Sequence, residues 1–102
     1  MAKEHILFDK TEIMAAVFFG NSAQLVNLKY SDIISISIKP FQEKAMFGKK
    51  PSEIIEIKCK GQNFPITYTK LKEKKFWDSY KANLKKFAKD NRITFNDETQ
   101  GA

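Results

Sequence analysis

The sequence of 102 residues is poor in the residue types on which several protein classes depend. Its single cysteine, Cys59, cannot form an internal disulfide, which excludes a small secreted scaffold held together by disulfides. A zinc site needs several convergent ligands, and with His5 as the only histidine neither a metal nor another cofactor is expected. The four glycines are isolated from one another, so the sequence lacks a glycine-rich loop that could hold a phosphate.

Long apolar runs are also missing. A membrane-spanning helix needs about 20 mostly apolar residues, whereas the longest run here, residues 13–19, has seven and is closed by Gly20. Acidic residues precede this run, and a basic segment, as in a secretory signal, does not. We therefore expect a soluble, cytoplasmic protein with a reduced thiol.

The residues that are present indicate one globular domain. The chain is 42% hydrophobic and 29% charged, and its length corresponds to a single domain of about 100–150 residues. Residues 96–102 are polar and lack an apolar anchor. We therefore expect one domain over residues 1–95, followed by a frayed tail.

Apolar residues in the first two thirds of the chain follow the spacing of strands. Alternating and short continuous apolar runs predict six strands, at residues 5–8, 12–19, 24–30, 34–38, 53–60 and 64–68. The two-residue turns Gly20-Asn21 and Gly61-Gln62 require antiparallel neighbours. Residues 39–52 contain Pro40, Gly48 and Pro51 without periodicity, and are expected to form a long loop.

The spacing then changes to that of a helix, at about residues 72–91. One face of this helix is apolar, and it consists of Phe76, Trp77, Tyr80, Leu84, Phe87 and Ala88. Residues 92–95 follow as a short extended segment. The expected fold is mainly β: a bent antiparallel β-sandwich or partly open barrel of six to seven strands, capped by one C-terminal amphipathic helix.

This order of elements, with Lys75-Phe76-Trp77 in the terminal helix, resembles that of pleckstrin-homology-like (PH-like) domains, especially the bacterial ones, over residues 5–91. The resemblance implies a binding module that can assemble with copies of itself. The sequence differs in having six strands before the helix instead of seven, and in the extra segment 92–95. The turns at residues 9–11 and 20–22 lack the cluster of basic residues with which that family grips inositol phosphates, so specific inositol-lipid recognition is not expected.

Positive charge is concentrated in one part of the chain. Residues 1–38 carry a net charge of −1 and residues 90–102 of −2, whereas residues 39–89 hold fourteen lysines and five acids, a net charge of +9. Two candidate surfaces lie in this basic region. The first, in the expected loop, is a candidate interaction surface made of Phe41, Lys44, Met46, Phe47, Lys49 and Lys50. The second is a candidate basic helix face made of Lys74, Lys81, Lys85 and Lys89.

Each surface has a second interpretation. Phe41 and Phe47 could fold back over the edge of the sheet instead of forming an exposed apolar tip with a cationic collar. The helix lysines could simply form a solvated face that keeps the protein in solution. Cys59 is in phase with Ile55 and Ile57, which predicts a buried thiol and not a reactive one.

Two functions fit this inventory, and an enzyme is not expected, because no base, nucleophile and orienting group are grouped around His5. The first is a protein-interaction or scaffold module that binds a protein partner or a second copy of itself. Met14, Ala16 and Phe18 support self-association, since a barrel or another copy would have to cover them. The alternative is a peripheral binder of anionic surfaces, above all membrane phospholipid. Nucleic acid is disfavoured, since the basic region has almost no arginine and its aromatic residues are expected to be buried.

Overall fold

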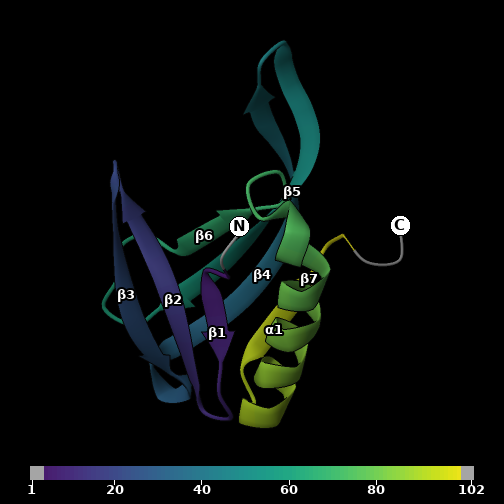
Figure 1. The fold of residues 1–102 in the computed structure, drawn as a ribbon. Coiled ribbons are helices and arrows are strands. Elements are labelled where there is room, and N and C mark those ends of the chain that lie inside the picture. The colour runs from purple at the N-terminus through teal and green to yellow at the C-terminus, as the bar shows by residue number, and fades with distance from the viewer. Residues whose placement is uncertain (1–3, 100–102) are drawn as a thin grey trace.

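The computed structural model describes residues 4–99 of the chain, as two β-sheets and a C-terminal helix (Figure 1). The first sheet has the strand order β1 (Ile6–Phe8), β2 (Glu12–Phe19) and β3 (Ser22–Lys29). The second has the order β6 (Ile66–Thr69), β5 (Gly48–Cys59), β4 (Ile33–Ala45) and β7 (Thr94–Asp97). The helix α1 covers Trp77–Asn91, and 3-10 turns lie at Tyr30–Asp32 (η1) and Lys74–Phe76 (η2). The expected fold class is confirmed: in the described part of the chain, seven strands form a β-sandwich with a C-terminal helix, and the barrel is not closed.

The predicted tight turn joins β2 and β3. Gly20 has a φ of 60°, which glycine adopts without the steric cost that a side chain would add. The two strands then pair without interruption, from Phe19 opposite Ser22 to Glu12 opposite Lys29. This register places Ile13 and Ala15 in the core, where both are fully buried.

The prediction of a long loop at residues 39–52 is wrong, because β4 and β5 continue through these residues and pair as a long hairpin. Two observations explain how Pro40 and Pro51 fit into these strands. The C=O of Ile38 accepts from Glu98 on one outer edge, and the C=O of Glu53 accepts from Lys70 on the other. Pro40 lies two positions after Ile38, and Pro51 lies two positions before Glu53. Backbone groups two positions apart in a strand face the same edge, so the nitrogen of each proline, which lacks a hydrogen, faces that outer edge. The ladder between β4 and β5 therefore loses no bond to them.

The predicted apolar face of the helix is confirmed. Trp77, Tyr80, Leu84, Phe87 and Ala88 are buried in the core between the sheets, and Phe76 is packed against them. The helix contacts β1, β4 and β7, and lies along one side of the sandwich (Figure 1). The end expected near residue 91 is correct. Within residues 4–99, no helix has both the length and the apolar character needed to cross a membrane.

The start expected at residue 72 is too early, because the chain turns before α1 begins at Trp77. The N–H of Glu73 donates to the C=O of Thr69, and Glu73 itself has a non-helical backbone, with φ −112° and ψ 28°. The 3-10 turn η2 then leads into the helix. Residues 70–73 therefore redirect the chain from β6 toward the side of the sandwich.

Regular structure continues beyond residue 95, where the domain was expected to end. The extended segment after the helix is β7, which pairs in parallel with β4 and places Asp97 opposite Ile38. The preceding helix provides the long crossover that parallel strands require. Of the expected frayed tail, residues 96–99 are hydrogen-bonded to the rest of the domain: the N–H of Glu98 donates to the C=O of Ile38, and Lys81 Nζ donates to Thr99 Oγ1. Residues 100–102 lie outside the described residues.

Candidate interaction surface on the distal arm

The outer part of the β4–β5 hairpin, residues 41–52, forms a two-stranded projection that we call the distal arm. On β5, β6 extends only as far as Ile54, and on β4, β7 extends only as far as Ile38. Beyond these points the two strands pair only with each other, from Phe41 opposite Ser52 to Ala45 opposite Gly48. Figure 1 shows the arm standing away from both sheets.

The tip of the arm exposes two large apolar side chains. Met46 is 90% exposed and Phe47 is 95% exposed, whereas Phe41 nearer the base is 38% exposed. Gly48 follows the tip with a φ of 111°, a conformation that other residues rarely adopt, so it allows the sharp reversal there. Phe47 therefore does not fold back over the edge of the sheet, and the first interpretation, an exposed apolar tip, is the one that the structure supports.

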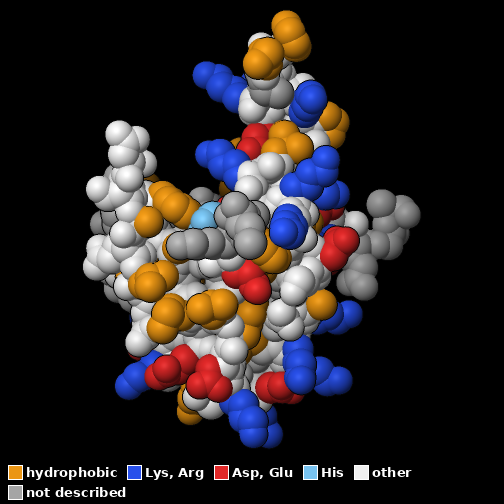
Figure 2. All heavy atoms as spheres, in the orientation of Figure 1, with side chains coloured by type: hydrophobic (Ala, Val, Ile, Leu, Met, Phe, Trp, Pro, Cys, Tyr) orange, Lys and Arg blue, Asp and Glu red, His pale blue; other side chains and the backbone are white. Residues whose placement is uncertain are grey.

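Lysines surround this tip. Lys44 and Lys49 lie directly opposite each other next to it, an arrangement that is unfavourable for like charges. Among residues 4–99, no carboxylate forms an ion pair with either of them. Figure 2 shows the resulting pattern, with hydrophobic side chains at the end of the arm and basic side chains around and below them.

The one acidic residue of the arm, Glu43, is turned away from solvent. It lies opposite Lys50, but only 7% of it is exposed. One carboxylate oxygen accepts a 2.9 Å bond from Ser52 Oγ, and the other accepts a 2.8 Å bond from Thr69 Oγ1. This contact fixes the base of the arm to the end of β6, and leaves lysines as the exposed charged groups of the arm.

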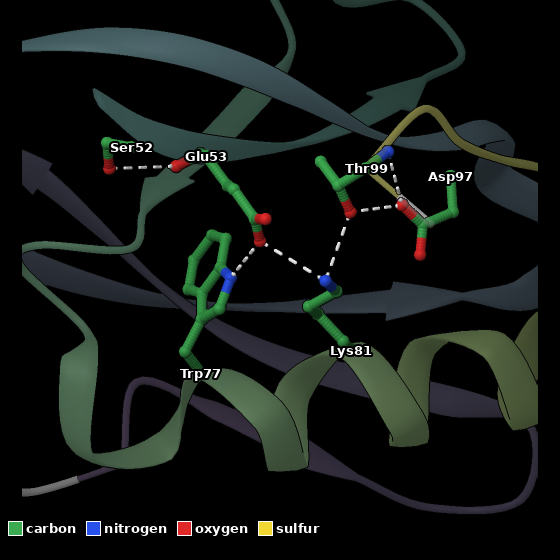
Figure 3. A network of polar contacts seen from close by, with 6 residues as sticks. All are labelled: Ser52, Glu53, Trp77, Lys81, Asp97 and Thr99. Atoms are coloured by element: carbon green, nitrogen blue, oxygen red, sulfur yellow. Dashed lines mark hydrogen bonds and ion pairs between the residues drawn. The ribbon is translucent and has the colours of Figure 1, made fainter. Parts of the chain in front are cut away.

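The candidate basic helix face is less uniform than the sequence indicated. Lys74 belongs to η2, ahead of the helix. Lys81 Nζ donates to Glu53 Oε1 at 3.2 Å and to Thr99 Oγ1 at 3.0 Å, so its charge is held within the protein (Figure 3). Lys85 and Lys89 are exposed. The four lysines therefore do not form one free surface.

The network around Lys81 joins the helix to the base of the arm. Trp77 Nε1 donates to the same Glu53 oxygen at 2.8 Å (Figure 3). Burial alone would raise the pKa of Glu53, but the hydrogen bonds from Trp77 and Lys81 outweigh it and lower the pKa below its usual value. Glu53 is thus held ionised at the point where the arm leaves the rest of the described domain, residues 4–40 and 53–99, which we call the body.

A second contact was not predicted from sequence. His5 Nδ1 lies 2.7 Å from Glu73 Oε1, and the His5 N–H donates to Tyr80 Oη at 2.8 Å. Since 68 residues separate His5 from Glu73, no local pattern could have indicated the pair. The side chains hydrogen-bonded to His5 are a carboxylate and a phenol, with no serine or cysteine nucleophile among those described. The contact holds the start of β1 against the segment that precedes the helix.

Outside the arm, the described residues also form a groove and bury the thiol of Cys59. A groove of about 630 Å³ lies between β2 and β6, and its lining includes Phe18, Phe64 and Tyr68. Within the described residues, no three His, Cys, Asp or Glu side chains converge as metal ligands. Cys59 is buried as expected, and burial raises the pKa of its thiol.

Compared with family models, curated proteins and solved structures, the chain has no match in any of the three.

Proposed function

We propose that this chain is a non-enzymatic protein-interaction module that docks on its partner through the distal arm. The observation that carries the proposal is the tip itself, where Met46 and Phe47 are almost fully exposed. Large apolar side chains in this position are costly in water and are typical of a contact surface. The partner surface that fits is an apolar recess bordered by acidic groups, because the exposed charges of the arm are lysines.

The order of elements is consistent with a PH-like module. Two sheets precede the helix as in that fold class, although they contribute six strands before it where the PH-like pattern has seven. The parallel strand β7 is an addition to the PH-like pattern. We retain the PH-like fold as a proposal, on which the proposal for the arm does not depend.

One observation favours a second candidate, the peripheral binding of an anionic membrane. Lys44 and Lys49 lie opposite each other and have no acidic partner among the described residues, so a surface rich in phosphate would relieve their repulsion. The apolar tip could then enter the interface between head groups and acyl chains.

The deciding experiment compares Phe47→Asp with Phe64→Asp. Phe64 is also highly exposed, at 83%, but lies between β5 and β6, away from the tip, and serves as the matched control. Wild type and both variants are used to capture proteins from lysate at low and high salt. They are also sedimented with phosphatidylcholine vesicles, with and without phosphatidylserine.

We expect a captured protein that Phe47→Asp loses and Phe64→Asp keeps. Its capture should survive high salt in large part, since apolar contact is nearly independent of ionic strength. Sedimentation that needs phosphatidylserine, disappears at high salt and depends on Phe47 would instead support the membrane candidate. If Phe47→Asp changes neither capture, nor sedimentation, nor the oligomeric mass, the arm is not a contact surface.

A further inference from the structure

A second exposed apolar surface lies on the first sheet, on the side that faces away from the core. We call it the apolar face, and it consists of Leu7, Met14, Phe18 and Leu25. Leu25 is 66% exposed and Phe18 is 52% exposed. Figure 2 shows hydrophobic side chains gathered over the first sheet, at the lower left of the molecule.

The strand register places these residues side by side. Leu7 lies opposite Met14, and Leu25 lies opposite Ala16, which is followed two positions along β2 by Phe18. Side chains alternate between the two faces of a strand, so residues that flank them in sequence point inward. Ile6 and Ile13 are accordingly fully buried. Ala16 is buried and the His5 ring packs edge-on against Phe18, but Met14 and Phe18 remain 37% and 52% exposed. Of the two covers expected for these residues, a closed barrel does not form in the described part of the chain, which leaves a second copy.

The charges near the apolar face are mixed, with Glu12 opposite Lys29, and unlike those of the arm they include a small excess of acids. Asp9 and Glu12 lie at the turn between β1 and β2, with the N–H of Asp9 donating to the C=O of Glu12. Over residues 1–38, which contain the whole face, four acids outnumber three lysines. The arm exposes lysines and buries its one acid. An apolar tip with a cationic collar and an apolar face in a region of net charge −1 match in apolar character and are opposite in the sign of their net charge.

We propose that the distal arm of one copy of this chain docks on the apolar face of a second copy. The inference rests on the proposed function of the arm and names its partner. The arm leaves the second sheet, whereas the face lies on the first (Figure 1). The contact therefore joins two different surfaces, and a pair of copies keeps one free face on the copy whose arm is docked and one free arm on the other. Such head-to-tail contacts generate rings or open chains.

The test uses one charge-introducing variant on each surface. Phe47→Asp disables the arm and Leu25→Asp disables the face. Phe64→Asp is the control: Phe64 belongs to neither surface, although it lines the same groove as Phe18. All three positions are largely exposed, so the thermal midpoints of the variants should stay close to that of wild type. Sedimentation velocity is measured over a concentration series for wild type, for each variant alone, and for an equimolar mixture of Phe47→Asp and Leu25→Asp.

Wild type and Phe64→Asp should associate beyond the dimer as concentration rises. Each surface variant alone should associate at least about tenfold more weakly, because an apolar contact is replaced by a buried charge. The mixture should form a dimer and stop there, since the arm of Leu25→Asp can dock on the intact face of Phe47→Asp. Recovery on mixing distinguishes docking of arm on face from any contact between identical surfaces.

Three results would overturn the inference. The first is a wild type that stays monomeric at every concentration, and the second is a mixture that fails to recover the dimer. The third is association lost in Leu25→Asp but kept in Phe47→Asp, which would mean that two apolar faces pack on each other. If in any of these cases a captured protein still depends on Phe47, the proposed function stands and only this inference fails.

Discussion

The two halves of the β4–β5 hairpin use one continuous ladder for different purposes. In the body, Ile36 lies opposite Ile57 and Ile38 opposite Ile55, and all four side chains are fully buried. A few residues further along, the same strands carry Lys44 opposite Lys49 and end at an exposed tip. Backbone pairing thus extends the arm, while its side chains contribute little to a core. The arm is suited to contact and the body to stability.

Because the side chains of the arm contribute little to a core, the stability of the arm must come from contacts at its base. An isolated two-stranded hairpin is marginal in water. Here Glu43 ties the base of the arm to Ser52 and Thr69, and Glu53 ties the same region to Trp77 and Lys81. The helix and β6 therefore hold the base, from which the two strands continue without further support.

The largest expected contrast is between Trp77→Ala and Phe47→Ala. Trp77 is 1% exposed and fills the core, so its removal should lower the free energy of unfolding by about 3–5 kcal/mol. Phe47→Ala removes a side chain that touches little and should change it by no more than about 0.5 kcal/mol. Urea unfolding followed by circular dichroism measures both. A cost above about 1 kcal/mol for Phe47→Ala would contradict the division between body and arm.

A smaller, pH-dependent effect on stability is expected at Glu53, which lies where the arm joins the body. The pKa of Glu53 is lowered in the folded protein from its usual value of 4.5. The ionised group therefore stabilises the fold above about that pH, and this contribution is lost as the pH falls below it. Glu53→Gln should remove about 1 kcal/mol near neutral pH, because it weakens the bonds to Trp77 and Lys81.

The measurement is urea unfolding of wild type and Glu53→Gln at several pH values between about 6 and 3. The two stabilities should converge toward acid pH, with wild type losing more than the variant. Parallel curves would show that the Glu53 carboxylate does not stabilise the junction. Of the two contacts at the base of the arm, only that of Glu43 with Ser52 and Thr69 would then remain as a source of stability.

Periodicity in the sequence was enough to predict the apolar faces that form the core, but not every boundary of the strands and the helix: β5 ends at Cys59 and β6 begins at Ile66, so Gly61-Gln62 is part of a longer connection and not a two-residue turn. The helix face from Phe76 to Ala88 and the alternating strands around Ile36 and Ile57 are local patterns, in which burial requires one spacing of apolar residues. The residues of the candidate surface could also be chosen from sequence, because Met46 and Phe47 lie among lysines without a periodic reason to be buried. That Met46 and Phe47 are exposed, and that they lie at the tip of a hairpin, could not be predicted from the sequence.

Contacts between distant residues account for what the sequence did not predict. Pro40 and Pro51 suggested a loop, because their compatibility with strands depends on which edge their nitrogens face. That edge is known only when the neighbouring strands are placed. The same holds for His5 and Glu73, and for Lys81, whose role as a free surface charge was ruled out by a carboxylate 28 residues away. Local pattern carries little information about such pairs.

The smallest expected effect is that of Lys49→Glu. This variant tests whether the two facing lysines lower the stability of the arm but strengthen its binding to a partner. The substitution places an acid opposite Lys44 and replaces repulsion by attraction, which is worth about 0.2–1 kcal/mol between facing strand residues. Because the arm can open without the body, hydrogen exchange of its amides is a more direct measurement than global unfolding. Protection of the arm amides should rise by a factor of about 1.5–5, and association through the arm should weaken. Lys58→Glu is the matched control, since Lys58 is an exposed residue of β5 opposite Ser35 in the body, and it should change neither. If Lys49→Glu leaves association unchanged while stabilising the arm, then the two facing lysines are not retained for binding, and the apolar tip alone carries the contact.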